Sequence, residues 1–480
     1  MLITAGILFP MLAGTVISLL RCPMEKKKPF YAVLMIAADL LALAAMLRGG
    51  SAVCLTFAPG VLLRFTPDGL GRWVLAAGML LYTAVCFYAF EYMESEERPE
   101  LFFAFFFVSF GALVAVCLAG DLVTMYLSFE LMTLTTVPMV LHERTKDAIS
   151  AGLKYLFYSI AGALMGLLAV FFVYHFAGTR DTAFLFGGFL DPASLAGREK
   201  LFLAVLFIGI IGFGTKAGLY PMHGWLPAAH PIAPAPASAL LSGIVAKAGV
   251  LAIIRLVYYS VGPDLLRGTW VQTVWTSLTL LTIFMGSMMA FREKVLKKRL
   301  AYSSISQISY ILLGLSLLSP EGLQGGLLHL MGHAAAKGCL FLTAGVFIHQ
   351  LGIRRVEDLR GIGKRMPVTL WCFTIASLSL VGIPPLAGFL SKWVIASAAI
   401  SSGAGVFRIL APVVLLVSAL LTAGYLLPVT VDGFFPGHGN SLSEEKAEPS
   451  RFMTIPLMLL CAAILATGIW GMPLLRLFGF

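Results

Sequence analysis

Long runs of predominantly apolar residues recur along the whole chain, separated by short polar stretches. A helix of about 20 residues is needed to cross the hydrocarbon core of a bilayer, and the pattern predicts fourteen such segments. The connecting stretches are too short for a soluble domain. We therefore predict an all-α, polytopic membrane protein of about fourteen transmembrane helices. The expected spans are 2–20, 30–47, 70–90, 101–118, 121–141, 150–176, 201–221, 236–259, 270–290, 300–318, 325–350, 368–395, 406–430 and 452–472.

Composition agrees with this pattern. The 480 residues are 59% hydrophobic and 12% charged, with a mean hydropathy of +0.91, whereas soluble domains carry about 25% charged residues. The net charge of +10 is typical of basic cytoplasmic loops, so it does not indicate nucleic acid. The seven cysteines never form a CxxC pair, which argues against an iron–sulfur cluster, a c-type haem or a zinc site. We expect no cofactor and no metal.

The distribution of basic residues predicts the orientation in the membrane. Numbered from the first, the odd loops hold nineteen Lys and Arg residues, whereas the even loops and the C-terminus hold nine. Lys and Arg gather in cytoplasmic loops. The odd loops are therefore expected in the cytoplasm, and both termini outside, in a multi-pass protein of the cell (inner) membrane.

Two of the expected spans are interrupted. Gly218 and Pro221 break the first, and Gly382, Pro384 and Pro385 break the second. Proline removes a helix hydrogen bond and clashes with the preceding turn. At membrane depth such a break survives only where it faces protein or a water-filled cavity. Both places are therefore candidate parts of a transport path.

The spacing of the two breaks predicts an internal repeat. They lie about five spans apart, and because five is odd, the second repeat must be inverted relative to the first. Paired broken spans in two repeats indicate a transport site. The expected division is 1–100 for the first three helices, 101–259 and 270–430 for the two five-helix repeats, and 452–480 for the last helix.

An acidic residue and a basic residue occur inside the spans around the first break. Glu130 lies near the middle of its span, and Lys216 directly precedes the break. A charge at membrane depth is costly unless it is paired, so Lys216 is the expected partner of Glu130. The alternative is a static ion pair that only fixes helix packing.

Two further lysines lie in apolar surroundings. Lys247 stands halfway along the span that follows the first break, and Lys392 follows the second break. A desolvated lysine can gain and lose a proton near neutral pH. The alternatives are snorkelling to the interface for Lys247 and an interfacial anchor beside Trp393 for Lys392.

Histidines provide a third set of candidates. His329, His333 and Lys337 stand at i, i+4 and i+8, so they share one helix face and can form a proton wire. The alternatives are satisfied core histidines or, without a third ligand nearby in sequence, a metal-binding pair. His223 and His230 flank the first break, where they either line a cavity or satisfy freed carbonyls.

Four stretches together resemble one family of membrane proteins. They are Lys216-Ala-Gly-Leu-Tyr-Pro-Met-His-Gly-Trp-Leu-Pro, then Ala-Pro-Ala-Ser-Ala-Leu-Leu-Ser-Gly before Lys247, Leu300-Ala-Tyr-Ser-Ser-Ile-Ser-Gln, and Gly382-Ile-Pro-Pro-Leu-Ala-Gly-Phe. In these stretches, and over about residues 70 to 430, the chain is similar to the antiporter-like subunits of respiratory complex I, Mrp-type sodium/proton antiporters and membrane-bound hydrogenases.

The resemblance implies fourteen helices in two inverted five-helix repeats. It also implies that Glu130 pairs with Lys216, that Lys247 is the central lysine, and that the region of His333 leads to a terminal Lys392. Some members carry a glutamate at this last position, and the chain has no long lateral helix after its final span. Both departures favour a D-type Mrp antiporter subunit or a hydrogenase-type subunit over the most distal complex I member.

These observations favour a proton-translocating, or sodium/proton-antiporting, membrane subunit. The sequence has no redox or nucleotide-binding motif, so it predicts no catalytic chemistry in this chain. Energy would come from an oxidoreductase-type or antiporter-type complex, and the resemblance implies homologous antiporter-like subunits, small membrane subunits and, in some members, a hydrophilic redox arm as partners. Two alternatives remain open: a self-sufficient carrier of a small solute, and a non-transporting scaffold for a redox arm.

Overall fold

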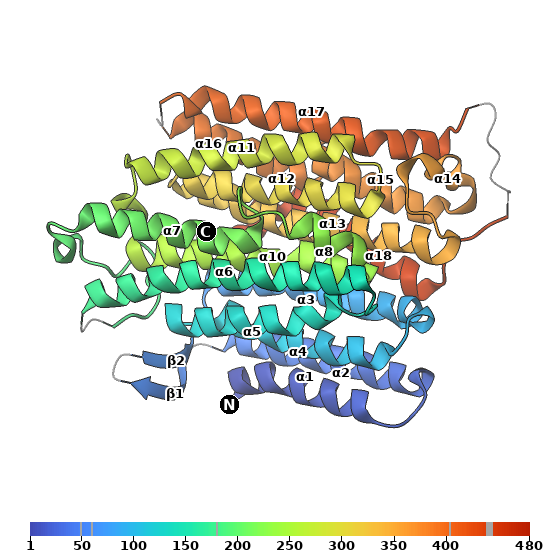
Figure 1. Ribbon diagram of the computed structural model, residues 1–480, viewed down its shortest axis with the longest axis horizontal. Coiled ribbons are helices and arrows are strands. Elements are labelled where there is room, and N and C mark those ends of the chain that lie inside the picture. The colour runs from blue at the N-terminus through green and yellow to red at the C-terminus, as the bar shows by residue number, and fades with distance from the viewer. Residues whose placement is uncertain (49, 59–60, 179–180, 403–404, 438–444) are drawn as a thin grey trace.

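The helices of the chain lie side by side and run back and forth along one common direction (Figure 1). The computed structural model describes residues 1–48, 50–58, 61–178, 181–402, 405–437 and 445–480. Within these residues twelve helices are long and apolar enough to cross a membrane. They are α1 (Leu2–Leu19), α2 (Met24–Leu47), α3 (Gly69–Tyr92), α4 (Pro99–Leu118), α5 (Leu122–Val140), α6 (Lys146–Ala177), α7 (Glu199–Ala217), the continuous helix from α9 to η4 (Ala235–Val261), α11 (Trp270–Arg292), α13 (Pro320–Leu351), α17 (Phe407–Phe434) and α18 (Arg451–Leu477).

The two other expected spans are helical as well. The region expected as 300–318 forms α12 (Leu296–Ser316), which is long enough to cross but less apolar because it buries several serines and Gln307. The region expected as 368–395 forms two shorter helices, α15 (Pro367–Val381) and α16 (Ala387–Ser401). The prediction of a helical, polytopic membrane protein is confirmed.

Both broken helices end at a glycine with a positive φ angle. Gly218 (φ +80°) follows α7, and Gly382 (φ +100°) follows α15. This left-handed conformation closes a helix and disfavours side chains with a Cβ atom. After the first break the chain continues through α8 (Leu226–Ile232), α9 (Ala235–Leu240), the π-helical turn η3 (Leu241–Val245), α10 (Ala246–Ile254) and the π-helical segment η4 (Arg255–Val261).

The broken helix is the fourth transmembrane unit in both expected repeats. In the order α4, α5, α6, α7–α8, α9–η4 it precedes the last unit, and α15–α16 has the same place in the order α11, α12, α13, α15–α16, α17. This order supports the division into 1–100, 101–259, 270–430 and 452–480, which stays a prediction.

A β-hairpin was not expected from the sequence. Strands β1 (Ala52–Ala58) and β2 (Val61–Phe65) pair antiparallel. They are too short for spans, and their run of apolar and β-branched residues suits a strand. The remaining short elements are η1 (Met93–Ser95), η2 (Pro192–Leu195), η5 (Pro263–Leu265), η6 (Val356–Leu359) and α14 (Ile362–Arg365).

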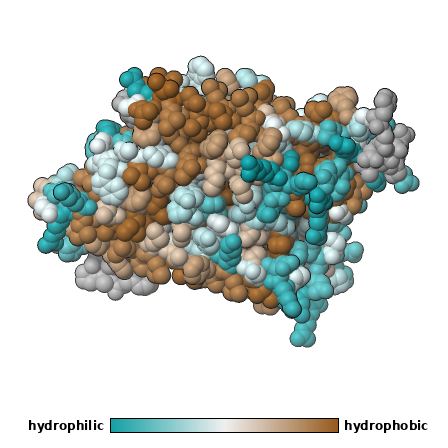
Figure 2. All heavy atoms as spheres, turned by 45° about the horizontal axis from the view of Figure 1, so that its top comes forward, coloured by the Kyte–Doolittle hydropathy of each residue, from teal (hydrophilic) through white to brown (hydrophobic). Residues whose placement is uncertain are grey.

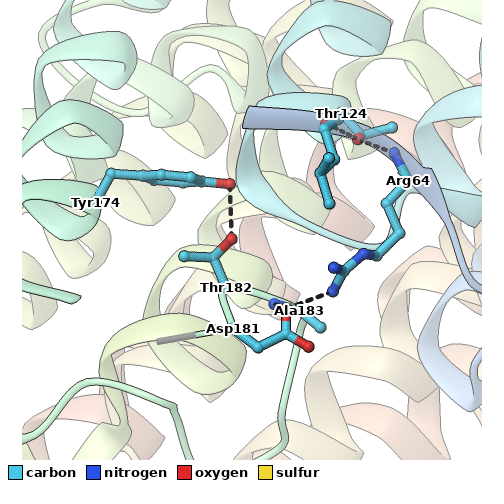
Figure 3. A network of polar contacts seen from close by, with 7 residues as sticks. Arg64, Thr124, Tyr174, Asp181, Thr182 and Ala183 are labelled. Carbon is cyan, nitrogen blue, oxygen red and sulfur yellow. Dashed lines mark hydrogen bonds and ion pairs between the residues drawn. The ribbon is translucent and has the colours of Figure 1, made fainter. Parts of the chain in front are cut away.

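Polar contacts fasten the hairpin to the neighbouring loop (Figure 3). The Arg64 Nη1 atom donates to Asp181 Oδ1 at 2.6 Å, and the Arg64 backbone N–H donates to the Thr124 hydroxyl at 2.8 Å. The Thr182 hydroxyl donates to the Tyr174 hydroxyl at 3.3 Å. Hairpin, loop and the ends of α5 and α6 thus form one connected surface.

The even loops and both termini lie on one face of the helix array. Phe478 packs against Trp73 near the start of α3, and Met1 lies beside Arg48 and Ala52. The odd loops meet on the opposite face, where α14 lies at the right of Figure 1. Hydrophobic side chains cover much of the surface between the two ends, and hydrophilic side chains gather toward them (Figure 2). The arrangement agrees with a shared side for both termini.

Two of the helices that carry sequence candidates, α9–η4 and α13, form the core. The α9–η4 helix is buried along its whole length and α13 along most of it, whereas α1, α2, α6, α17 and α18 present an apolar face outward. A polar residue on α10 or α13 is therefore shielded from lipid on all sides and must find its partners inside the protein.

Candidate functional site

Lys216 and Glu130 lie near one another but do not form a direct ion pair among the described residues. The Lys216 side chain is 1% exposed, and its Nζ atom donates to the Thr133 hydroxyl. Thr133 stands on α5 three residues after Glu130, which places both on the same side of the helix. The charges of Glu130 and Lys216 interact, yet Glu130 Oε1 is buried and has no hydrogen-bond partner in the described part of the chain. Lys216 thus binds α5 one helical turn beyond Glu130.

Aromatic rings surround the Lys216 ammonium. Its Nζ atom lies 5.0 Å from the ring centroid of Phe129 and 5.5 Å from that of Tyr155. A ring face attracts a cation within about 6 Å. The Tyr155 hydroxyl is itself fixed by the Thr136 hydroxyl at 2.8 Å. The rings hold a cation in an apolar setting without a carboxylate in direct contact.

Lys247 turns back onto its own helix. It is fully buried, and its Nζ atom donates to the carbonyl oxygen of Ser242 in the π-helical turn η3. π-Helical turns occur frequently at functional sites. The Ser242 hydroxyl lies 2.6 Å from that of Ser304 on α12. This turn therefore joins Lys247 to the second half of the molecule.

A glycine allows α10 to approach α7 at Lys216. A Cβ atom at Gly249 would lie 2.5 Å from the Phe213 carbonyl oxygen and 3.0 Å from the Lys216 Cβ. Small residues let membrane helices pack with their backbones close together. Gly249 thereby brings the helix of Lys247 directly against the helix of Lys216.

The face of α13 that carries His329, His333 and Lys337 lies beside Lys247. The Nζ atom of Lys337 donates to the Leu300 carbonyl at 3.1 Å, and the charges of Lys247 and Lys337 interact. The rings of His333 and His329 lie along the helix with centroids 5.9 Å apart. Both ring nitrogens of His333 are buried and without a partner among the described residues. Their free hydrogen-bonding capacity is open to water or a proton.

Lys392 lies at the far end of this line of residues, beyond His329. A 2.8 Å hydrogen bond joins His329 Nδ1 to the hydroxyl of Ser391, which directly precedes Lys392 on α16. The Lys392 Nζ atom donates to the carbonyls of Leu380 and Val381 at 2.5 and 2.9 Å. These are the last carbonyls of α15, where the helix dipole favours a cation. Lys392 thus reaches back across the second break.

Comparison with known proteins identifies the family. The family model described as "NADH:quinone oxidoreductase/Mrp antiporter, TM" matches residues 119–422. The chain belongs to this family. It is 33% identical over 431 residues to the NADH-quinone oxidoreductase component designated N in Desulforudis audaxviator, a match that covers 86% of this chain and 82% of the relative.

Two more matches of this antiporter-family chain are to a component of a Na(+)/H(+) antiporter and to a chain of an Mrp complex. It is 28% identical over 428 residues to the Na(+)/H(+) antiporter component designated D in Alkalihalophilus pseudofirmus, covering 85% of this chain and 83% of that one. A chain in the structure of the Mrp complex from Dietzia sp. superposes with a TM-score of 0.84 at 23% identity, covering 99% of this chain and 96% of that one. That likeness shows a shared fold.

The seven candidate residues of this family member lie along one row, buried at its centre and half-buried at Glu130 and Lys392, and within the described part of the chain they do not bond directly to one another. Across the described ranges, each lysine ammonium of the row donates to a hydroxyl or a carbonyl instead. Several polar atoms in and beside the row are buried without a partner among the residues that the structure describes, including Glu130 Oε1, His329 Nε2 and both amide atoms of Gln307. Buried polar atoms of this kind are usually satisfied by internal water. The row therefore has the character of a path with gaps that water can bridge.

Sequence reasoning missed the neutral members of the row. Thr133, Tyr155, Ser242, Gln307 and Ser391 carry no charge, so nothing marked them among the many polar residues of the spans. A signal existed for Thr133, because it stands three residues after Glu130. Lys216 and Lys392 do not occupy equivalent positions in the two expected repeats, because Lys216 precedes the break in its helix and Lys392 follows the break in its own.

Proposed function

We propose that this chain is a proton-translocating subunit of a multi-subunit membrane complex. The observation that carries the proposal is a row of seven ionisable residues on five different helices, of which Lys216, Lys247, Lys337, His333 and His329 are buried and Glu130 and Lys392, at its two ends, are half-buried. Unpaired at membrane depth, seven such groups would cost on the order of 15 kcal/mol. A whole domain is stable by only about 5–15 kcal/mol, so these groups require hydrogen-bond partners or internal water along the row, as a proton path does.

The charge of the row favours the proton over sodium as the ion that moves along it. Glu130 is its single carboxylate, and four of its seven members are lysines. A sodium ion about 5 Å from one lysine would be repelled by about 3 kcal/mol at an effective dielectric of 20. A proton instead binds covalently to a neutral lysine or histidine, so these side chains provide binding sites for a proton and none for sodium.

We assign Lys247 as the switch between two half-paths. When Lys216 moves from Thr133 toward Glu130, its positive charge is partly neutralised, and Lys247 can hold a proton. When Lys216 leaves Glu130, repulsion between the two ammonium groups favours release of the Lys247 proton toward Lys337 and His333. The Thr133 contact and the electrostatic link to Glu130 support two positions of Lys216.

The relatives suggest the setting. They include components of an NADH-quinone oxidoreductase and of a Na(+)/H(+) antiporter. We propose that this chain assembles with homologous and small membrane subunits in the cell (inner) membrane, with the odd loops in the cytoplasm and both termini outside. It then depends on its complex, or on an ion gradient, for energy.

Reconstitution tests this proposal. The complete complex in sealed vesicles should acidify or alkalinise the lumen in a sodium-free medium, whereas the single chain in liposomes should show no redox activity and little transport. Robust ion exchange by the purified chain alone would contradict the dependence on partners. If transport by the complex stops in a sodium-free medium and returns when sodium is added, the assignment of the proton as the transported ion would be contradicted.

A further inference from the structure

We infer that Glu96, Glu143, Lys297 and His230 form an entrance that leads protons from the odd-loop face directly to Lys247 and Lys337. The inference rests on the proposed function and adds a route to it. None of these four residues belongs to the row described above. They come from four separate parts of the chain, and each step between them is marked by a contact or an electrostatic interaction.

The outer end of this entrance is acidic. Glu96 is half-buried after η1, and Glu143 is exposed in the loop between α5 and α6. Burial raises the pKa of Glu96, and the negative charge of Glu143 raises it further, whereas Lys297 opposes the shift. The other groups that face this end are Tyr92 on α3 and Arg354 after α13. A carboxyl with raised proton affinity at the surface is suited to capture protons.

Lys297 connects this mouth to the first broken helix. Although it stands in the first turn of α12, it is only 4% exposed, and its charge interacts with those of Glu143 and Glu96. Its Nζ atom donates to the carbonyl of Ala233 in the gap between α8 and α9. The Ser238 hydroxyl donates to the same carbonyl at 3.2 Å and to that of His230 at 2.9 Å. The carbonyls freed by the break are thus satisfied by Lys297 and Ser238.

The His230 ring is left without a structural hydrogen bond. It is fully buried, it stacks on Phe341 with centroids 4.9 Å apart, and neither ring nitrogen has a partner in the described part of the chain. A neutral imidazole carries one donor and one acceptor, and burying both unpaired is costly. This ring therefore does not serve to satisfy freed carbonyls, which was one interpretation of its sequence position.

The position of His230 gives the ring its role. The ring interacts electrostatically with Lys297 on the outer side and with Lys337 and Lys247 on the inner side. With two free nitrogens it can accept a proton on one and release it from the other. The route reaches the centre without passing Glu130 and Lys216, which then act on Lys247 through their charge.

Replacement of His230 in the complete complex tests the route. We expect His230→Phe to lower proton translocation in sealed vesicles by about tenfold or more, since a lost relay group typically costs 10² to 10⁴ in rate. His230→Gln keeps hydrogen bonding but cannot carry a proton, and it should fall to the same level. His175→Phe, at an exposed position on α6, is the matched control and should leave the rate unchanged.

Lys247→Arg in the same vesicles separates the two claims. Normal rates for both His230 variants with an inactive Lys247→Arg would overturn the entrance and leave the proposed function standing. Normal rates for all of these variants would overturn the proposed function itself.

The surface residues give a second readout that does not depend on core packing. In Glu143→Gln a negative charge beside Glu96 is lost, so the pKa of Glu96 falls and the limb of the pH–rate profile that it sets moves to lower pH. Glu97→Gln, at an exposed position in the same loop as Glu96, should not move the profile. Should the His230 variants not assemble, an unchanged profile in Glu143→Gln would by itself overturn the entrance.

Discussion

The ammonium group of Lys216 is bound by the hydroxyl of Thr133, one helical turn from the carboxylate of Glu130. Lys216 therefore has two alternative partners on the same side of α5, one neutral and one charged. The neutral partner leaves the full positive charge of Lys216 facing α10, where Gly249 brings the neighbouring helix into contact. This arrangement makes the Glu130 contact a state that Lys216 can enter and leave.

The first prediction concerns Glu130. Glu130→Gln removes the charge that attracts Lys216 and keeps the size of the side chain, so Lys216 should stay at Thr133. We expect proton translocation in sealed vesicles to fall by about tenfold or more, while the amount of assembled complex in the membrane stays the same. Unchanged translocation would mean that the Glu130–Lys216 interaction has no part in the cycle.

The second prediction concerns Thr133. Thr133→Val removes the neutral partner of Lys216, so the ammonium should move to Glu130 and remain there. Losing a hydrogen bond to a charged group costs about 1.5–3 kcal/mol, and the move to Glu130 offsets part of it. Translocation should fall because Lys216 no longer alternates, whereas Thr133→Ser, which keeps the hydroxyl, should pump near the normal rate. Equal rates for the two variants would contradict this role.

The apolar runs predicted the helices because a membrane span must be apolar over about 20 residues. They could not predict the β-hairpin at 52–65, since two short apolar runs are ambiguous without knowing what they pack against. The breaks at Gly218 and Gly382 were predictable because glycine and proline act locally on the backbone.

Contacts across the bundle were beyond the sequence. That Lys216 faces Thr133 depends on how α7 is rotated against α5, a matter of fractions of a turn. The two interpretations of His230 were decided by Lys297, which is distant in the chain and occupies the freed carbonyl of Ala233. Charged residues within spans stood out because they are rare there, and neutral partners such as Ser242 did not.

The third prediction concerns an ion pair outside the row, in which Arg255 is buried and Asp68 is 28% exposed. Arg255 is fully buried in η4, and both of its Nη atoms donate hydrogen bonds to the carboxylate of Asp68, the one from Nη2 at 2.7 Å. Its Cζ atom lies 4.6 Å from the ring centroid of Phe184. Arg255→Leu should lower the stability of the protein by about 3 kcal/mol, because Asp68 loses its partner. Arg355→Leu, which breaks an exposed pair with Glu357, should change it by less than about 0.5 kcal/mol. Thermal unfolding of the complex measures both, and equal midpoints would contradict the prediction.

The fourth prediction concerns pH and the network of Figure 3. The hydrogen bond from Arg64 lowers the pKa of Asp181 below its ordinary value. A carboxyl with a lowered pKa in the folded state stabilises it above the unfolded pKa, about 3.9, and this contribution is lost as the pH falls through the folded value. The Ala183 amide, which donates to Asp181 at 3.1 Å, should lose protection from hydrogen exchange in that range. In Arg64→Gln the loss should begin at higher pH, and an unshifted profile would contradict the link.

The central claim is that Lys247 releases and takes up the transported proton, and Lys247→Arg tests it most directly. Arginine keeps the positive charge and a similar length but does not give up its proton at usable pH. Proton translocation by the complete complex in sealed vesicles is the quantity to measure, with Lys247→Ala beside it. The account predicts that Lys247→Arg abolishes translocation as fully as Lys247→Ala. Translocation by Lys247→Arg near the normal rate would contradict it, because Lys247 would then act only through its charge.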